Sequence, residues 1–473
     1  MSTIDTAVRG TNPLRTFTKW IGGINPSVFM FSAAVLAIIF ANSSLAGLYT
    51  SILNAPVNLE IAGYNFFQIH GRTMTVTEFI NDALMVLFFF SVGLEIKREM
   101  VNGSLSSVRK AMLPTIAACG GIIMPILLFL AIENQDPIAL RGVTIPMATD
   151  IAFSLAVLGL LGKRVPVTLK LFLMALAVVD DIAGILVIAI FYSTGIQWVP
   201  LVLGLITILI AYLFAKKGVS SSSVYYILLI IVWSFFVQSG IHSTIAGVLL
   251  ALVVPHRPTI HPRDLEEDMR RLDVHVASSK QAGYVQKDFL DDDYINDMRI
   301  TQRRIQRTIS PVQIMEHEVS PWVHYLVLPL FAFSNSGIAF GDMSGSEAIG
   351  VAIAVAVGLF VGKTIGIFGF TYLATKLRLV RLTPGVTYAN VFGISVFGGI
   401  GFTVSLFLAT LAYQAIGAEA EEYLNMAKLG IIIGTVVSGV VGVIVLNAIL
   451  KREEKMGRGA ASKEYKEYIA NSK

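Results

Sequence analysis

Two adjacent carboxylates, Asp180 and Asp181, lie near the middle of an apolar run that extends from Leu169 to Tyr192. The run is long enough to cross a bilayer, where a charged side chain at the centre costs about 2.5 to 3.5 kcal/mol on insertion scales. Neighbouring positions on a helix point about 100° apart, so a single partner does not satisfy both carboxylates. Such a pair favours a cation or proton site over the alternative, an inert buried polar network.

A third carboxylate belongs to the motif TIPMATDIAFSLAVLGLLG in the preceding apolar segment. Pro146 removes a backbone donor and disfavours helix at the residue before it. Thr149 and Asp150 then precede an apolar run, which is the signal of a helix N-cap. The motif predicts a span that breaks inside the membrane, with Asp150 near the positive end of a half-helix. The alternative is a continuous helix with a proline kink.

A glycine-rich interruption, Gly398 to Gly401, occurs in a later apolar run and is followed by Thr403 and Ser405. Glycine is about 1 kcal/mol less favourable than alanine in a helix, although in membranes it also serves close helix packing. Two interrupted spans at corresponding places in two halves of a chain are the sequence pattern of a transporter binding site. The two interruptions therefore indicate a site where the segments meet.

One cation, Lys363, lies in the middle of the apolar run GLFVGKTIGIFGF. An unpaired ammonium group at that depth is costly, so a partner is expected. Asp180 is one candidate, and the partly negative carbonyl ends of half-helices are another. The alternative, in which the side chain reaches the membrane surface, is difficult from mid-span.

Further titratable residues gather on the span EFINDALMVLFFFSVGLEIKRE. At its inner end lie Glu95, Arg98 and Glu99, where Glu95 and Arg98 can pair at i,i+3 and the two glutamates share one face. They form either an ordinary charged helix end or a cluster that lines a cytoplasmic funnel. A lone histidine is usually just hydrogen-bonded, although it titrates near neutral pH. The remaining candidates of this kind are Asp82 at the outer end of the span, His242 and His317.

These motifs belong to a chain of 473 residues, 55% of them hydrophobic and only 14% charged, against about 25% charged in soluble domains. The composition predicts an all-α polytopic membrane protein. The single cysteine, Cys119, excludes an internal disulfide. The segment before Pro26 is polar, so we do not expect it to be a cleavable secretory signal.

Apolar length and periodicity predict twelve spans between Pro26 and Leu450, flanked by tails at 1–25 and 451–473. The expected spans are 26–47, 78–99, 111–132, 144–162, 167–192, 198–215, 224–237, 241–254, 321–340, 349–374, 386–413 and 426–450. Of the 36 Lys and Arg residues, only Arg72, Arg141 and Lys428 fall on the outer side, and Lys363 falls within a span. Positively charged loops stay in the cytoplasm, so both termini are expected there.

Two connections between the spans are distinctive. Residues 54–77 alternate in polarity and predict a β-hairpin on the outer side, with an irregular loop as the alternative. Residues 256–320 form a long cytoplasmic connection of mixed charge with few aromatic residues. Exposed amphipathic helices or disorder are expected there.

Six motifs together resemble the NhaA-type sodium/proton antiporters over nearly all twelve spans. They are INDALM at Ile80–Met85, VGLEIKRE at Val92–Glu99, ATDIAF at Ala148–Phe153, LKLFLMALAVVDD at Leu169–Asp181, PLFAFSNSG at Pro329–Gly337 and GIGFTVSLF at Gly399–Phe407. This family is itself among the transporters that illustrate paired interrupted spans. The resemblance implies two inverted three-span repeats, the third to fifth and the tenth to twelfth spans, with two broken helices that cross at mid-membrane.

The resemblance also implies roles for single residues. Asp180 and Asp181 would form the cation and proton site, with Thr149 and Asp150 nearby. Asp150 would compensate half-helix N-termini, and Lys363 would lie opposite Asp180. The positions that the family associates with cytoplasmic pH response are matched by Glu95, Arg98, Glu99, Glu316 and His317.

The activity that the resemblance implies is exchange of Na⁺, and of Li⁺, for H⁺ in the inner membrane of a bacterium, with no enzymatic activity and no cofactor. The expected partners are these ions, membrane lipid and a second copy of the chain, bound through the outer hairpin at 54–77. Nucleic acid is not among them. The connection at 256–320 is longer than we expect for the family, and it adjoins Glu316 and His317.

The chemistry of the aspartate pair fits antiport without the resemblance. Na⁺ is a hard cation that takes oxygen ligands, and the carboxylates that supply them bind protons when Na⁺ leaves. Exchange is electrogenic if Lys363 also exchanges a proton. A sodium-coupled organic-anion symporter of similar architecture is the alternative. An intramembrane aspartyl protease fits less well because it draws its aspartates from different helices, and a passive channel does not explain the central lysine.

Overall fold

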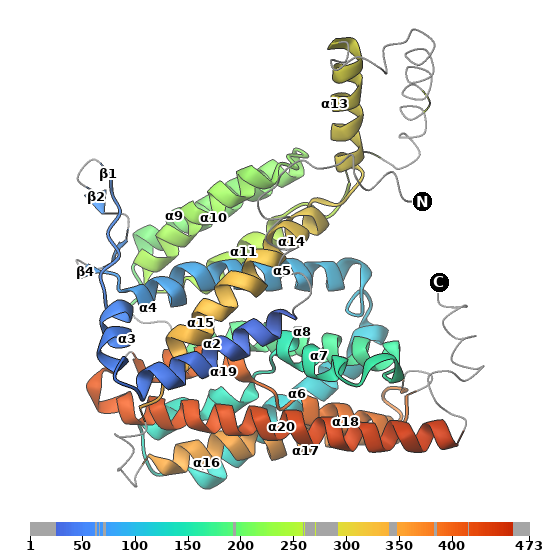
Figure 1. Cartoon of the computed structure of the whole chain (residues 1–473). Helices are drawn as coiled ribbons and strands as arrows, with labels where there is room; N and C mark the ends of the chain where they lie inside the picture. The colour runs from blue at the N-terminus through green and yellow to red at the C-terminus, as the bar shows by residue number, and fades with distance from the viewer. Residues whose placement is uncertain are drawn as a thin grey trace.

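The computed structural model of the chain is a bundle of helices that lie side by side (Figure 1). It describes residues 25–456 except 62–63, 66, 70–71, 193–194, 259, 261–269, 271–291, 340–347, 383–385 and 415, so most of both predicted tails lies outside the described residues. Within the described residues, seven helices are long and apolar enough to cross a membrane. They are α4–α5 (Val76–Asn102), α6 (Val108–Ile132), α8 (Val167–Phe191), α9 (Trp198–Lys216), α10 (Ser222–Ser239), α16–α17 (Ile349–Lys376) and α20 (Glu421–Lys455).

In the described part of the chain, three further pairs of helices are together long and apolar enough to cross a membrane, and each pair is bent at a break. These pairs are α2 (Pro26–Ala41) with α3 (Ala46–Leu53) at 117°, the 3₁₀ helix Ala139–Met147 with α7 (Ile151–Gly159) at 47°, and α18 (Tyr388–Phe397) with α19 (Phe402–Gln414) at 49°. The other two expected spans correspond to the short helix α11 (Thr244–Val253) and to a continuous helical stretch. That stretch consists of α14 (Pro311–Trp322), the π-helical turn Val323–Val327 and α15 (Leu328–Asn335). The all-α membrane class is confirmed, and the fourth and eleventh spans are interrupted as their sequences predict.

The spans expected to form the two repeats pack against each other. α6 lies along α17 (Lys363–Lys376), and their backbones touch at Gly120 and Gly366. A Cβ added at Gly120 would come within 2.2 Å of the Gly366 carbonyl oxygen, so only glycine permits this approach. The contact holds Lys363, the first residue of α17, inside the bundle.

The two ends of the bundle differ in their secondary structure (Figure 1). At one end, residues 54–77 contain two successive antiparallel pairs, β1 (Glu60–Ile61) with β2 (Tyr64–Asn65) and β3 (Gln68–Ile69) with β4 (Arg72–Thr73). At the other end lies α13 (Asp292–Arg307), a polar helix within the connection at 256–320 whose side chains Met298 and Ile305 are exposed. The helical stretch that contains the predicted ninth span starts at Pro311, before the predicted Pro321, and Pro311 lies in the first turn, where proline is tolerated.

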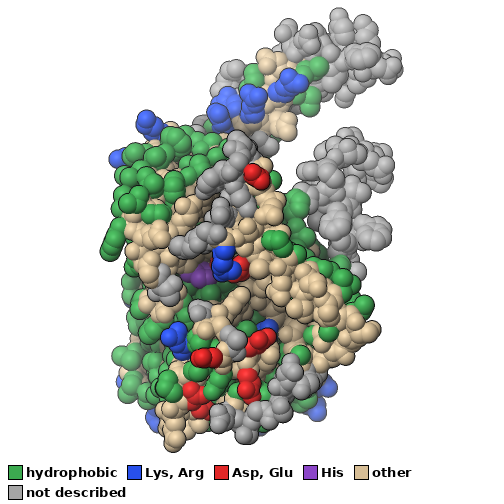
Figure 2. Space-filling view, turned by 90° about the vertical axis from the view of Figure 1, so that its left-hand side faces the viewer, with side chains coloured by type: hydrophobic (Ala, Val, Ile, Leu, Met, Phe, Trp, Pro, Cys, Tyr) green, Lys and Arg blue, Asp and Glu red, His purple; other side chains and the backbone are tan. Residues whose placement is uncertain are grey.

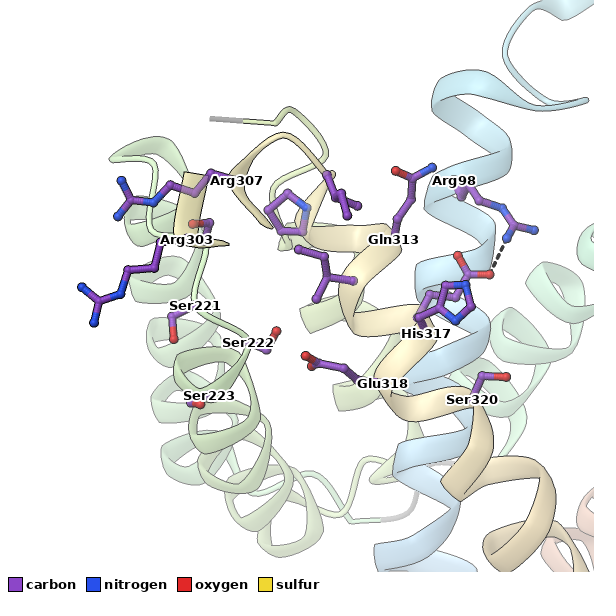
Figure 3. A pocket seen from close by; sticks show the side chains of 15 residues that line it. Arg98, Ser221, Ser222, Ser223, Arg303, Arg307, Gln313, His317, Glu318 and Ser320 are labelled. Atoms are coloured by element: carbon purple, nitrogen blue, oxygen red, sulfur yellow. Dashed lines mark hydrogen bonds and ion pairs between the residues drawn. The ribbon is translucent and has the colours of Figure 1, made fainter. Parts of the chain in front are cut away.

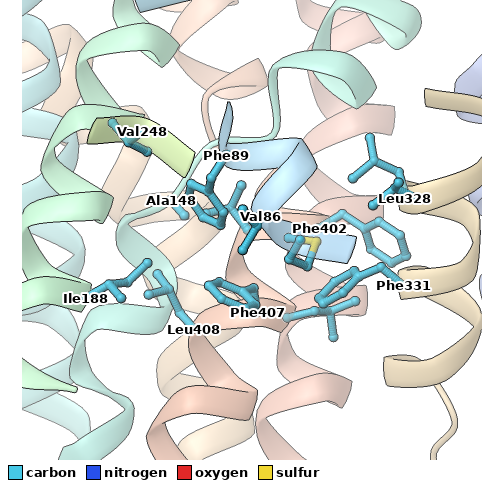
Figure 4. Packing of buried hydrophobic residues seen from close by; sticks show 14 of the residues in the cluster. Val86, Phe89, Ala148, Ile188, Val248, Leu328, Phe331, Phe402, Phe407 and Leu408 are labelled. Atoms are coloured by element: carbon cyan, nitrogen blue, oxygen red, sulfur yellow. The ribbon is translucent and has the colours of Figure 1, made fainter. Parts of the chain in front are cut away.

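Buried aromatic side chains fill the middle of the bundle (Figure 4). The ring centroid of Phe407 in α19 lies 5.4 Å from that of Phe89 in α5 and 6.1 Å from that of Phe331 in α15. We call these three residues the central apolar cluster. Close packing, rather than removal from water, holds helices together within a bilayer, so the cluster fixes the spacing of α5, α15 and α19.

Candidate cation site

The two interrupted spans cross where their helices stop. Residues Ala148 to Asp150 separate the 3₁₀ helix from α7, and Gly398 to Gly401 separate α18 from α19. The backbone N–H of Asp150 donates to the carbonyl oxygen of Ile400 at 2.7 Å, so the two interruptions are hydrogen-bonded to each other. Broken helices within a membrane need such partners for the backbone groups that the break leaves free.

The carboxylate of Asp150 caps the N-termini of both half-helices. Its Oδ1 accepts a hydrogen bond from the N–H of Phe153 in α7 at 2.9 Å. Its Oδ2 accepts from the N–H and the hydroxyl of Thr403 in α19 at 3.1 and 2.6 Å. Helix N-termini carry partial positive charge, so this one carboxylate, only 2% exposed, lies against two positive helix ends. The geometry suits the charge compensation expected of Asp150.

Lys363 is fully buried beside the crossing. Its Nζ donates to Oδ2 of Asp180 at 2.5 Å and to Oγ1 of Thr149 at 3.0 Å. The Thr149 hydroxyl can itself donate to the same Asp180 oxygen at 2.7 Å or to the carbonyl oxygen of Gly398 at 2.9 Å. The ammonium group therefore has the carboxylate partner that a buried charge requires.

The aspartate pair keeps oxygen atoms that can bind a proton or a cation. Oδ1 of Asp180 is buried and has no hydrogen-bond partner among the described residues. Asp181 lines a cavity of about 220 Å³ together with Thr149, Asp150 and Glu95. Carboxylate and hydroxyl oxygens are the ligands that a hard cation prefers, so the residues present fit a Na⁺ ion.

This cavity leads toward the end of the bundle that carries α13. Glu316 and Ser320 of α14 line both this cavity and a second one of about 1200 Å³. Figure 3 shows the larger cavity, with Arg98 and Ser320 on one side and Ser221–Ser223, at the start of α10, on the other. A path of polar side chains therefore connects Asp181 with that end of the molecule.

The residues expected to respond to pH gather where the two cavities meet. Arg98 forms an ion pair with Glu316, and its guanidinium group lies 3.7 Å from Glu99 and 3.9 Å from Glu95. His317 lies on the exposed side of α14 and lines the larger cavity. The structure thus brings Glu95 and Glu316, but not His317, to the cavity of the aspartate pair.

Asp82 and His242 lie apart from the aspartate pair, near the end that carries the β-strands. The Nε2 of His242 is 3.6 Å from Oδ1 of Asp82, and the Ser243 hydroxyl donates to the Asp82 carbonyl oxygen at 3.0 Å. All three line a cavity of about 210 Å³, and Figure 2 shows this face, where acidic, basic and histidine side chains surround a hollow. The ring of Phe407 lies 5.3 Å from that of His242, so the central apolar cluster lies between this cavity and the crossing at Thr403.

Sequence reasoning missed several partners at the crossing. Thr403 stood out as a polar residue after the glycine run, but nothing indicated that it would bind Asp150. The Ser154 hydroxyl, which donates to the carbonyl oxygen of Phe397 at 3.2 Å, was not noticed at all. A small polar residue at a helix start is a capping signal, and it could have pointed to Thr403. No signal in one sequence identifies the distant partner.

Paired interrupted helices that cross beside a buried carboxylate–ammonium pair define a secondary transporter of the inverted-repeat class. A sequence model of the family described as Na⁺/H⁺ antiporter 1 matches residues 23–446, and the chain belongs to that family. Curated relatives named Na(+)/H(+) antiporter NhaA, from Porphyromonas gingivalis (strain ATCC 33277), Parabacteroides distasonis and Pseudomonas putida, are 48%, 46% and 38% identical. The matches cover 91%, 93% and 91% of this chain and 94%, 97% and 96% of the relatives. The resemblance seen in the motifs is confirmed.

Proposed function

We propose that this protein exchanges Na⁺ for H⁺ across the inner membrane of a bacterium. The observation that carries the proposal is the buried cluster at the crossing. There Asp180, bonded to Lys363 and Thr149, keeps one carboxylate oxygen without a partner among the described residues, next to Asp181. Membership of the Na⁺/H⁺ antiporter 1 family and the names of the curated relatives support the proposal.

In this mechanism Na⁺ and H⁺ compete for the same carboxylates. Na⁺ takes oxygen ligands from Asp180, Asp181 and Thr149, and it binds the carboxylates only when they are deprotonated. Adjacent carboxylates repel each other when both are charged, so their proton binding is coupled. The arrival of Na⁺ therefore releases protons, and the arrival of protons releases Na⁺.

Lys363 makes the exchange electrogenic in this proposal. Its ammonium group neutralises Asp180 while no Na⁺ is bound, at 2.5 Å. Na⁺ replaces it as the counter-charge of that carboxylate, and a lysine left without a partner in a buried site gives up its proton. More than one proton then moves for each Na⁺, and the net charge movement makes transport sensitive to membrane voltage.

The site is reached from the end of the bundle that carries α13. Lys and Arg residues concentrate at that end, so we assign it to the cytoplasm and place both termini there. Alternating access then requires the path at Glu316 and Ser320 to close. It also requires the central apolar cluster to open toward the cavity of Asp82.

Five finer assignments belong to the same proposal. Li⁺ is a hard cation of the same charge and uses the same oxygen ligands. The contacts of Arg98 with Glu316, Glu99 and Glu95 form the pH-responsive part of the cytoplasmic path. The strands within 54–77 provide the contact of a homodimer, and lipid covers the exposed apolar side chains of α9. The cycle needs no cofactor, because both ions are substrates.

The size of the central cavity argues against the organic-anion symporter. A cavity of about 220 Å³ beside the aspartate pair is smaller than the roughly 300 to 1,000 Å³ of most small-molecule sites. The acidic side chains that line it also repel an anion. The volume and the negative charge of this cavity favour monovalent cations and protons as substrates.

The decisive test is Na⁺-driven dissipation of a proton gradient in inside-out vesicles, with the intact chain and with Asp181→Asn. The exchange proposal predicts that Na⁺ collapses the gradient with the intact chain and not with the variant, because the amide cannot exchange a proton. Ser51→Ala, a change on the surface helix α3, serves as the control for expression and insertion. A gradient that Na⁺ leaves intact with the unaltered chain at every pH from 6 to 9 would overturn the proposal.

A further inference from the structure

Two of the family motifs, INDALM and PLFAFSNSG, meet at a place that the exchange mechanism above does not use. Asn81 lies in the π-helical turn Phe79–Leu84 that precedes α5, and Asn335 is the last residue of α15. Nδ2 of Asn335 donates to Oδ1 of Asn81 at 2.8 Å, and Nδ2 of Asn81 donates to Oδ1 of Asn335 at 3.2 Å. The two side chains are only 6% and 3% exposed, so they form a buried, reciprocal amide pair.

Thr410 adds a third helix to this pair. Its hydroxyl, in α19, lies 3.2 Å from Oδ1 of Asn335 and 2.9 Å from the carbonyl oxygen of Leu406. We call Asn81, Asn335 and Thr410 together the outer latch. It joins the span Val76–Asn102, which ends in α5, to α15 and α19, and the same three segments supply the central apolar cluster.

The outer latch lies beyond the cation site, on the side away from the path at Glu316. Thr410 follows Thr403 along α19 by about 10 Å, at a rise of 1.5 Å per residue. Asn81 adjoins Asp82, which lines the cavity at the end with the β-strands. The latch and the central apolar cluster therefore hold the bundle closed between the cation site and that end.

The end of α15 carries more polar groups than this conformation satisfies. The Oγ atoms of Ser334 and Ser336, on either side of Asn335, are buried and have no hydrogen-bond partner among the described residues. Buried hydroxyls are normally paired, so two unpaired ones side by side need an explanation. Water that entered this end of α15 in a second conformation would supply their partners.

We propose that Asn81 and Asn335 are positioning residues of the exchange cycle, and that their amide pair must separate before the cation site can open to the outer side. The inference rests on the proposed antiport function. Two neutral hydrogen bonds shift a two-state equilibrium by about tenfold, so both states stay populated. The pair therefore favours the inward-open conformation while leaving the outward-open one accessible.

The test uses a cysteine reporter at the end of α15. Cys119 is the single cysteine of the chain, so Cys119→Ser gives a background in which Ser336→Cys is the only thiol. In right-side-out vesicles, a membrane-impermeant maleimide reaches this fully buried position only when the outer side opens. We expect Asn81→Ala to raise the rate of modification about tenfold, and Thr410→Val, which removes only the third contact, to raise it less.

Asn390→Ala is the matched control. Asn390 is a buried asparagine, 1% exposed, whose Nδ2 donates to Oε2 of Glu453 near the opposite end of the bundle. Loss of this amide should leave the modification rate of the reporter unchanged. An unchanged rate in Asn81→Ala, or an equal increase in Asn390→Ala, would overturn the latch.

A transport measurement separates the latch from a merely structural role. A weaker latch favours the outward-open state, so Asn81→Ala should lower the KM for Na⁺ at the outer face and raise it at the inner face. A purely structural defect lowers the maximal rate on both faces without opposite changes in KM. If the unaltered chain exchanges Na⁺ for H⁺ and these opposite changes are absent, the latch fails while the proposed function stands.

Discussion

The positive charge of Lys363 is neutralised at the candidate site by the carboxylate of Asp180, through one of its oxygen atoms, Oδ2. Oδ2 lies within hydrogen-bond distance of both the Lys363 ammonium group and the Thr149 hydroxyl, while Oδ1 of the same carboxylate has no partner among the described residues. The charge of this carboxylate is neutralised by the ammonium group, but two donors on one oxygen leave the hydrogen-bonding capacity of the other oxygen unused. This asymmetry explains how one residue can hold a counter-ion and still accept a proton or Na⁺.

The buried ion pair should be visible in the stability of the folded protein. Lys363→Met leaves Asp180 without its counter-charge, and breaking a buried pair from one side costs about 3 to 5 kcal/mol. We expect a clear fall in the thermal unfolding temperature of the purified protein at neutral pH. The double variant Lys363→Met/Asp180→Asn should recover part of the loss, because it removes both charges. Equal or greater loss in the double variant would contradict the pairing.

The sequence predicted the charged residues of the site better than the neutral ones. A charge at mid-membrane is so costly that Asp180, Asp181 and Lys363 each demanded a partner, and few partners were available. A threonine or an asparagine carries no such penalty as long as it forms any hydrogen bond. The roles of Thr403 and Asn335 therefore became apparent only when the fold placed them beside residues from distant spans.

At the scale of helices and turns, the site depends on two half-helices that start at one carboxylate. α7 and α19 belong to different repeats, yet the same Asp150 side chain binds the first turn of both. The crossing is therefore held by a shared cap as well as by the packing of α6 on α17. A displacement of either half-helix strains the bonds of the other.

Removal of this cap should weaken both half-helices at once. An N-cap contributes about 1 kcal/mol, so Asp150→Ala should lower the free energy of unfolding by about 2 kcal/mol. Thr403→Val loses the hydroxyl bond but keeps the backbone one, and a smaller effect is expected. The comparison can be made by thermal unfolding in lipid nanodiscs. Similar losses in the two variants would show that Asp150 does not serve α7.

The interrupted elements were predicted because the breaks have local causes. Pro146 with Asp150, and the glycines 398, 399 and 401, disfavour a continuous helix whatever surrounds them. The helix that leads into the ninth span starts earlier than the predicted span, at Pro311, because Pro311 and Pro321 both fit a helix start and sequence alone does not choose between them. Alternating polarity predicted strands in 54–77, but it could not show that they would form two short pairs.

At the scale of the whole molecule, two cavities lined by described residues lie on opposite sides of the cation site, and of these two the one with Asp181 in its wall reaches it. The path through Glu316 leads to Asp181, whereas the cavity of Asp82 ends behind the central apolar cluster and the outer latch. The described conformation is therefore open toward one end. Competition between Na⁺ and H⁺ at the aspartate pair can then be measured from that side.

The pH dependence of transport should follow from this competition. In the proposed mechanism protons and Na⁺ share the carboxylates, so lowering the pH by one unit should raise the KM for Na⁺ about tenfold for each competing proton. Initial rates in inside-out vesicles at several Na⁺ concentrations and pH values give this slope. The maximal rate at saturating Na⁺ should change much less. A KM independent of pH would mean that the two ions bind at different places.

The place where the cavity of Asp181 adjoins the larger cavity at the α13 end has a further consequence. It is lined by Glu95 and Glu316, with Glu99 close by and Arg98 as the cation among them. Acidic walls of low dielectric focus the electric field and concentrate cations from solution, over a distance that shrinks to about 8 Å at physiological ionic strength. Such acidic walls thus hold a local excess of cations, Na⁺ among them, over the surrounding solution. The supply of ions to the aspartate pair then depends on the total salt around the protein as well as on its Na⁺.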